Sequence, residues 1–136
     1  MGRLINIETT KTPEEVIESI KFNASKFNFI IRTVFNMGEE FKKHNVEVAN
    51  DFKYYSILIC NPERAYQTMI INPKRGAVLL QPKQIIVFEK NNKTNIVYFA
   101  LNQKEISNAL PEDLKFQESL TESCTKIENL IKLSVE

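Results

Sequence analysis

The residues of this chain that could do chemistry gather around one cysteine, Cys60, in the middle of the sequence. The stretch from Ser56 to Glu89 reads as an apolar strand, a helix that opens at Asn61-Pro62, a loop and a second apolar strand. A cysteine directly before a helix faces unpaired backbone N–H groups and the positive end of the helix dipole. Both stabilise a thiolate, so this spacing predicts a reactive thiol or a binding site for an anion.

Cys60 and Asn61 also have purely structural interpretations. A free cysteine at a strand end is often a small buried apolar residue. Asn61 is explained as a helix cap worth about 1 kcal/mol, although the same backbone amides could hold an anion. These two uses compete, because an asparagine in the cap occupies the donors. The functional interpretation is favoured by basic residues close by in the sequence: Arg64, Lys74, Arg75 and Lys83.

The rest of the chain offers few partners for catalysis. His44 is the only histidine, so a Cys-His or Ser-His-Asp arrangement would have to use it. We expect a surface histidine there, with an axial haem ligand as the alternative. One histidine and two widely separated cysteines make no multi-ligand metal motif, and the three glycines form no phosphate loop. We assign no catalytic residue, no metal and no cofactor, and the sequence leaves open whether the chain is an enzyme.

Composition narrows the class of protein. The 136 residues, 43% of them hydrophobic and 26% charged, predict one globular domain over residues 1–136. A net charge of +1 gives no general attraction to nucleic acid or an anionic membrane, and no apolar run approaches the roughly 18 residues of a membrane span. Two cysteines fit free thiols in a reducing compartment, so we expect a cytoplasmic protein.

The elements that must position Cys60 follow from apolar periodicity. A first strand over residues 3–10 places Ile5 and Ile7 on one face, and a capping box of Thr12 and Glu15 starts a helix. A second strand over residues 28–35 places Phe29, Ile31 and Phe35 on one side. A helix between two strands makes a crossover, which favours a parallel pair.

The remaining elements continue the alternation of helix and strand. We predict a helix over 36–45 capped by Asn36, with Phe41 as its main apolar contact, a loop over 46–52, a strand over 53–60 and a helix from Pro62. The apolar stripe of that helix is Ala65, Tyr66, Met69 and Ile70. A turn over 72–76, an apolar segment over 77–80 and a strand over 84–89 follow, with Pro82 at a strand start or an edge.

The C-terminal third completes the predicted fold. A polar turn at 91–94 joins a strand over 95–101 as a hairpin, and Asn102 starts a short helix to Ala109. A last helix runs from about Ser119 to Ser134, with one apolar face that comprises Phe116, Leu120, Cys124, Ile127 and Ile131. The expected fold class is α+β, a two-layer sandwich with a mixed sheet of about five strands packed by helices, in the order β-α-β-α-β-α-β-β-α.

The central stretch resembles the uncharacterised domain-of-unknown-function 302 family. In that family a tyrosine-led strand ends in Cys-Asn-Pro and is followed by a short helix, a loop that ends in Pro-Cys and a valine-rich strand. The matching residues here are Tyr55, Ile57-Leu58, Cys60-Asn61-Pro62, Ala65, Pro73, Gly76, Leu79-Leu80, Pro82 and the strand 85–89. The resemblance covers most of the chain in order and implies a small α+β sandwich, a homodimer and no settled activity.

Two departures from that family pattern bear on function. Lys83 stands where the family has its second cysteine, so this chain cannot use that pair as a dithiol or a metal site. The segment from Gly76 to Pro82 is also about two residues longer than the family pattern. Lys83 could neutralise a thiolate or a bound anion, or it could be a solvated residue at a strand start.

Three functions remain open from the sequence. The leading one is a homodimeric domain that binds a small molecule or an anion, without nucleic-acid or membrane partners. Its ligand-binding set is Tyr55, Cys60, Asn61, Pro62, Arg64 and Lys83, although Tyr55, like Tyr66, could equally belong to the core or an interface. The second is a thiol-dependent enzyme or sulfur carrier with Cys60 as the nucleophile. The third is a structural or protein-interaction module.

Overall fold

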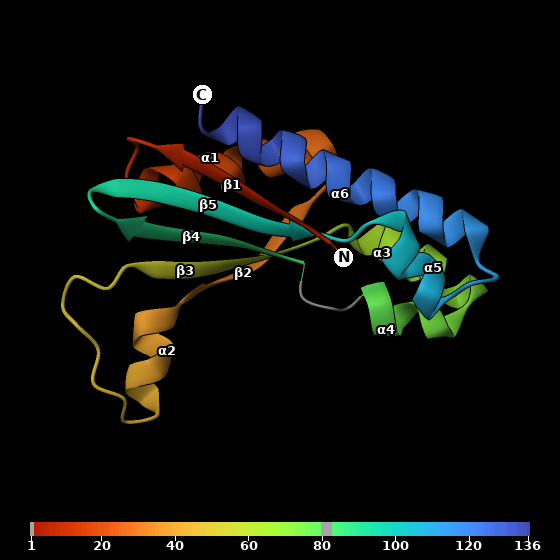
Figure 1. Cartoon of the computed structure of the whole chain (residues 1–136), viewed down its shortest axis with the longest axis horizontal. Helices are drawn as coiled ribbons and strands as arrows, with labels where there is room; N and C mark the ends of the chain where they lie inside the picture. Colours follow the sequence, from red (N-terminus) through yellow and green to blue (C-terminus); the bar gives the residue numbers. More distant parts are fainter. Residues whose placement is uncertain (1, 80–82) are drawn as a thin grey trace.

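The computed structural model describes residues 2–79 and 83–136, and it contains one five-stranded sheet (Figure 1). The strand order is β1-β5-β4-β3-β2, and all four pairings are antiparallel. The strands are β1 (Arg3–Thr9), β2 (Ile30–Asn36), β3 (Tyr54–Cys60), β4 (Gln84–Lys90) and β5 (Lys93–Ala100). The sheet therefore has the predicted number of strands.

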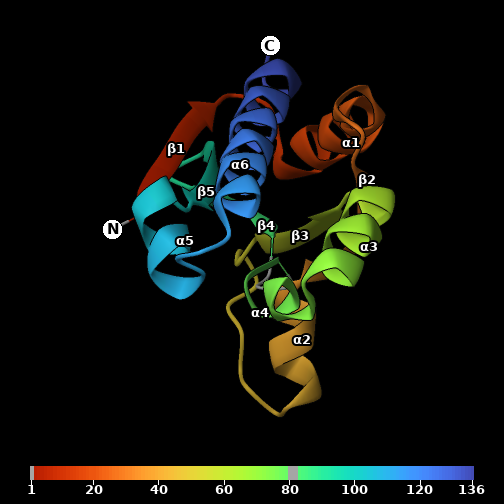
Figure 2. The same ribbon diagram turned by 90° about the vertical axis from the view of Figure 1, so that its right-hand side faces the viewer.

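Helices cover one face of the sheet and gather at one of its ends. They are α1 (Pro13–Asn23), α2 (Met37–Lys43), α3 (Pro62–Ile71), α4 (Gly76–Leu79), α5 (Gln103–Ala109) and α6 (Leu114–Ser134), with short 3-10 turns η1 (Ala24–Phe27) and η2 (Pro73–Arg75). In Figure 2, α1 and α6 lie side by side on the sheet. In Figure 1, α3, α4 and α5 lie at one end of the sheet, and α2 lies below it. This two-layer arrangement confirms the α+β fold class.

The core lies between the sheet and the α1–α6 layer. Alternate residues of the central strands, Ile57 in β3, Ile85 in β4 and Ile96 in β5, are fully buried against Ile20 of α1 and Ile127 of α6. Burial of each such side chain stabilises the fold by roughly 1.5–3 kcal/mol. The predicted capping box fixes the start of α1, because Thr12 accepts from the Glu15 amide and the Glu15 carboxylate accepts from the Thr12 amide.

The sheet is antiparallel rather than mixed. Four successive antiparallel pairings leave β1 and β2 running in the same direction, as a helical crossover predicts, but they occupy opposite edges with three strands between them. The central strands are apolar on both faces, for example at Ile85 and Ile86, whereas β1 and β2 carry exposed polar residues such as Asn6 and Arg32. Polar alternation suits an edge strand, and apolar residues on both faces suit the centre.

A register shift in β2 changes which side chains face the core. The pairing with β3 slips between Ile31 and Thr33, so Ile31 and Val34 both pack against the core. Phe35, which we predicted to share a face with Ile31, is 37% exposed. A bulge of one residue reverses the alternation beyond it, and the sequence gives no signal of its position.

Two helices differ from their predicted faces or starts. In α3, Tyr66 and Ile70 of the predicted apolar stripe are exposed, whereas Ala65 and Met69 of the same stripe are half-buried. Helix α6 begins at Leu114, five residues before the predicted Ser119, with Asp113 as its cap. All five residues of its predicted apolar face are buried.

The apolar segment after η2 is helical where the structure describes it. Residues 76–79 form the short helix α4, and the predicted position of Pro82 lies outside the described residues.

Phe41 of α2 is 40% exposed and contacts Phe52, with 6.3 Å between ring centroids. Over the described ranges, no helix combines the length and apolarity that crossing a membrane requires.

Candidate functional site

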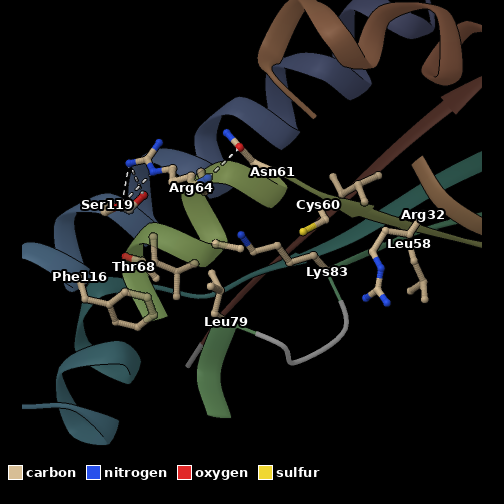
Figure 3. Close-up of a pocket in the computed structure, with 14 residues that line it drawn as sticks. Arg32, Leu58, Cys60, Asn61, Arg64, Thr68, Leu79, Lys83, Phe116 and Ser119 are labelled. Atoms are coloured by element: carbon tan, nitrogen blue, oxygen red, sulfur yellow. Dashed lines mark hydrogen bonds between the residues drawn. The ribbon is translucent and has the colours of Figure 1, made fainter. Parts of the chain in front are cut away.

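A cavity of about 120 Å³ lies where β3 ends and α3 begins (Figure 3). Lys83 and α6 form its other sides. Its uncharged polar lining comprises Cys60 and Asn61 together with the hydroxyl residues Thr68, Ser119 and Ser123. Its apolar lining comprises Leu58, Ile59, Ala65, Leu79, Phe116 and Leu120. The cavity therefore forms around the cysteine that the sequence singles out.

Asn61 acts as the cap of α3 and leaves few backbone donors at the helix start. Its side-chain oxygen accepts from the Arg64 amide at 3.2 Å, and its carbonyl accepts from the Ala65 amide at 2.9 Å. Pro62 has no N–H group. Three of the first four backbone positions of α3 are thus unable to serve an anion, which makes the helix start a weak anion cradle.

Lys83 extends across the cavity beside Cys60, as Figure 3 shows. Its carbonyl accepts from the Ile59 amide at 3.0 Å, which attaches its backbone to the end of β3. Burial lowers the pKa of Lys83, the Cys124 and Cys60 thiols counteract this in part, and the Arg64 charge adds to it. The lysine amine therefore lies within electrostatic range of both cysteines.

Arg64 lines the cavity mainly with its aliphatic stem. Its Nε and Nη2 atoms donate to the Ser119 hydroxyl at 3.1 and 2.6 Å, and Nη2 lies 3.6 Å from the Glu122 carboxylate. In Figure 3 the guanidinium group points toward Ser119 and away from Cys60. Arg64 thus joins α3 to α6, and the Glu122 carboxylate already balances part of its charge.

Arg32 is a further cation of this cavity that sequence reasoning missed. It stands at the register shift of β2, is exposed and lies at the mouth of the cavity, on the other side of Cys60 from the Lys83 amine in Figure 3. The only sequence signal was an arginine that interrupts the apolar run from Phe29 to Phe35. The direction of its side chain depends on the bulge, which that signal does not reveal.

Two of the candidate residues lie elsewhere. Tyr55 stands at the opposite end of β3 from Cys60, and its hydroxyl donates to the Glu14 carboxylate at 3.3 Å. Burial, with a smaller effect of Glu14, raises the pKa of Tyr55. Pro62 lines a separate shallow groove that it shares with Ser25 and Asn28. The structure therefore brings together Cys60, Asn61, Arg64 and Lys83, without Tyr55 and Pro62.

A buried ion pair fixes one wall of the cavity. Arg75 donates to both carboxylate oxygens of Asp113 at 2.6 Å, and the two side chains are only 7% and 12% exposed. Arg75 also donates to the Thr68 carbonyl at 3.1 Å, and its guanidinium lies 5.5 Å from the ring centroid of Phe116. Since Thr68 and Phe116 line the cavity, this Arg75–Asp113 clamp holds α3 against the start of α6.

The clamp also explains the charge state of Asp113. The Arg75 hydrogen bonds, helped by those from Asn72 and the Phe116 amide, lower the pKa of Asp113 to about 2. The carboxylate is therefore ionised over the whole neutral range. Arg75 lies 38 residues before Asp113 in the sequence, so local patterns do not identify the two as partners.

The chemical capacity of the cavity is that of one thiol beside basic groups. Cys60 is half-buried and free, whereas Cys124 is free and buried in the core. Within residues 2–79 and 83–136, no three His, Cys, Asp or Glu side chains form a group that could hold a metal ion. The described lining contains three basic residues and no carboxylate. This arrangement can hold a small anion next to a thiol.

Comparisons with known proteins agree with the resemblance found in the sequence. A solved structure of an uncharacterised conserved protein DUF302 from Bacillus stearothermophilus is similar in fold, with a TM-score of 0.68 and 17% sequence identity over 97% of this chain and 94% of that chain. No curated protein sequence matches. The family model of the domain of unknown function DUF302 matches residues 5–132. The chain therefore belongs to the DUF302 family.

Proposed function

We propose that this chain is a small-molecule-binding domain that holds an anionic group in the cavity beside Cys60. The observation that carries the proposal is the composition of the cavity, which Arg32, Arg64 and Lys83 line without any carboxylate among its described residues. Opposite charges a few ångströms apart attract most strongly where protein excludes water. A small anion would thus replace the solvent that balances these charges.

Lys83 is the residue on which this proposal depends most. Burial lowers the pKa of Lys83, so its charged form is less favourable in the cavity than it would be in water. A bound anion would offset that cost and favour the protonated amine. Arg64 contributes less, because the Ser119 and Glu122 side chains already engage its guanidinium. Anion affinity should accordingly fall as pH rises and Lys83 loses its proton.

Titration of the protein with inorganic phosphate and butanoate tests the proposal, with calorimetry as the readout. Lys83→Met keeps the length of the side chain and removes its charge, so binding should weaken about tenfold or more. Lys104→Met is the matched control, because Lys104 is an exposed lysine of α5 outside this cavity. Equal affinities of the two variants, or no binding to the unmodified protein, would contradict the proposal.

A second candidate function is thiol chemistry at Cys60. Its support is that Cys60 is half-buried at the cavity surface, and that Lys83 lies within electrostatic range. In a Cys124→Ala background only Cys60 can react with iodoacetamide. Reaction that begins well below pH about 8.5 would support an activated thiol. Reaction only at or above that pH would leave Cys60 as a binding or structural residue.

A homodimer in the cytoplasm is the remaining part of the proposal. Phe41 of α2 and Phe52 of the segment before β3 are partly exposed, with their ring centroids 6.3 Å apart, and Phe35 of β2 is also exposed. Exposed apolar residues grouped in this way mark protein interfaces, and the stacked rings of Phe52 and Tyr54 extend this group. Two free cysteines suit a reducing compartment. Light scattering of the purified protein measures its mass, and a monomer would contradict the dimer.

A further inference from the structure

The sheet divides into two arms at the end that carries Lys83. Strands β4 and β5 pair from Lys90–Lys93 to Ile86–Val97. Beyond that point β4 continues beside β3 to Gln84–Leu58, whereas β5 continues beside β1 to Ala100–Arg3. We call the gap between these two arms the fork. A second cavity, of about 440 Å³, lies in the fork.

The lining of the fork is mainly apolar. It comprises Leu4, Val78, Ile86, Val97, Phe99 and Leu101, with Leu120 and Cys124 of α6 on the helix side. Leu4 and Phe99 face each other across β1 and β5 and are 64% and 55% exposed. Burial raises the pKa of Tyr98, whose hydroxyl lies against the Cys124 thiol. Large apolar side chains are therefore left in contact with solvent around a concave surface.

Lys83 joins this apolar cavity to the basic one. Both Lys83 and Leu120 line the two cavities. The basic cavity, at about 120 Å³, is smaller than the roughly 300 Å³ at which typical ligand pockets begin, whereas the fork lies within that range. A ligand that fills both would place charge at Lys83 and apolar surface in the fork.

We propose that the ligand of this chain is an amphiphilic alkyl carboxylate, with its carboxylate at Lys83 and its alkyl chain in the fork. This inference rests on the proposed anion site and names its ligand class. The head group follows from the donors: Asn61 and Pro62 leave few backbone amides for a phosphate, so a monoanion held by side-chain cations fits better. The tail follows from the apolar lining.

A chain-length series tests the tail. Calorimetric titration with butanoate, hexanoate, octanoate and decanoate, all below their micelle concentrations, should show affinity rising about three- to fourfold per added methylene until the fork is full. Octylamine has the same tail with the opposite charge and should not bind. An affinity that stays constant along the carboxylate series would overturn the inference.

A pair of variants separates the head from the tail. Val97→Phe fills the fork from a central strand and should weaken decanoate at least about tenfold, while butanoate binding stays unchanged. Val46→Phe is the matched control, because Val46 is 50% exposed in the loop after α2. Lys83→Met should weaken every acid of the series. Decanoate that binds Val97→Phe as tightly as the unmodified protein would also overturn the inference.

The outcomes distinguish this inference from the proposed function. Lys83-dependent binding of phosphate and butanoate with no gain from longer chains removes the alkyl tail and leaves the anion site standing. Absence of binding for phosphate and every carboxylate overturns both. Chain-length-dependent binding that Lys83→Met does not weaken supports an apolar cavity alone and contradicts the joint site.

Discussion

The two ends of the β4–β5 pair differ in structure: the strands stay paired at the hairpin end and separate at the fork end. At the hairpin end, Asn91 and Asn92 take positive φ values of 54° and 61°, which the turn of a two-residue hairpin requires. The strands beside them stay paired, with Thr94 and Asn95 buried. At the fork end the same strands separate, and two cavities lie there. The half-buried Lys83 lines both of them, and the free cysteine Cys60 lines the basic one.

This difference indicates that the fork end is locally less stable than the hairpin end. The residues of the hairpin end are explained by structure alone, because they form paired strands and a suitable turn. At the fork end, burial of Lys83 opposes folding, and Leu4 and Phe99 contribute little to stability because they stay largely exposed. Residues that break local rules without a structural gain commonly belong to functional sites. The following predictions test this contrast, from the largest effect to the smallest.

The largest effect should come from the clamp that supports the fork end. Asp113→Asn removes the charge and leaves Arg75 buried without its partner, so the free energy of unfolding should fall by about 3–5 kcal/mol. Urea denaturation measures this loss. The double variant Arg75→Met/Asp113→Leu serves as the control and should recover most of it. A loss below about 1 kcal/mol for Asp113→Asn would mean that the clamp is dispensable.

The clamp should also give the protein a characteristic acid sensitivity. The pKa of Asp113 falls from 3.8 to about 2 on folding, so its contribution is fully present above pH 3.8 and is lost as pH drops toward 2. That shift corresponds to about 2 kcal/mol of stability. Denaturation curves measured between these pH values should show it. Asp113→Asn should lack this component of the pH dependence, and unchanged acid sensitivity in that variant would contradict the assignment.

Removal of the α3 cap should have an intermediate effect. Asn61→Ala leaves the Arg64 amide without its acceptor and should cost about 1 kcal/mol of unfolding free energy. Asn61→Asp retains the cap and serves as the matched control for stability. Because an aspartate adds a negative charge beside Lys83, this control should weaken phosphate binding. Tighter phosphate binding by Asn61→Asp would argue against an anion at this place.

A small stabilisation is expected at the hairpin end. Asn92→Gly relieves the cost of a positive φ in the turn and should raise the free energy of unfolding by about 0.5 kcal/mol. Thermal denaturation measures the change, and phosphate affinity should stay as it is. Reduced affinity in this variant would show that the two ends are coupled.

A similarly small stabilisation at the fork end should have a functional cost. Lys83→Met replaces a half-buried cation with an apolar side chain and should raise the free energy of unfolding by about 0.5 kcal/mol. In contrast to Asn92→Gly, it should lose anion affinity. If Lys83→Met destabilises the protein, the lysine has a structural role and the contrast between the two ends fails.

The local elements could be predicted because their signals lie within a few residues of one another. The capping box at Thr12 and Glu15, the Asn61 cap, and the apolar face from Phe116 to Ile131 all have the predicted geometry or burial. The start of α6 was placed five residues too late, since Ser119 and Glu122 mimic a capping box inside the helix. Asp113 competes as the cap and gains Arg75 as a partner.

The candidate site could be predicted only in part. Cys60, Asn61 and Lys83 were identified because a strand end, a helix start and a family pattern mark them. Arg32 was missed because its direction depends on a bulge, and Tyr55 was included although it lies at the far end of its strand. Arg64, predicted to bind the ligand, lines the cavity, but its guanidinium engages Ser119 of α6.

By itself the sequence determined the α+β class, most helix starts and the central position of Cys60, because capping and alternation act between neighbouring residues. Only the tertiary structure decided that β1 and β2 lie at opposite edges, that β4 and β5 part at the fork, and that Lys83 joins two cavities. These features depend on which strands pair over long separations. Strand pairing is set by the burial of both faces of the sheet at once, which no local pattern encodes. Cys60 therefore marks a place in the sequence, and the basic side chains Arg32, Arg64 and Lys83 that line its cavity give that place its chemistry.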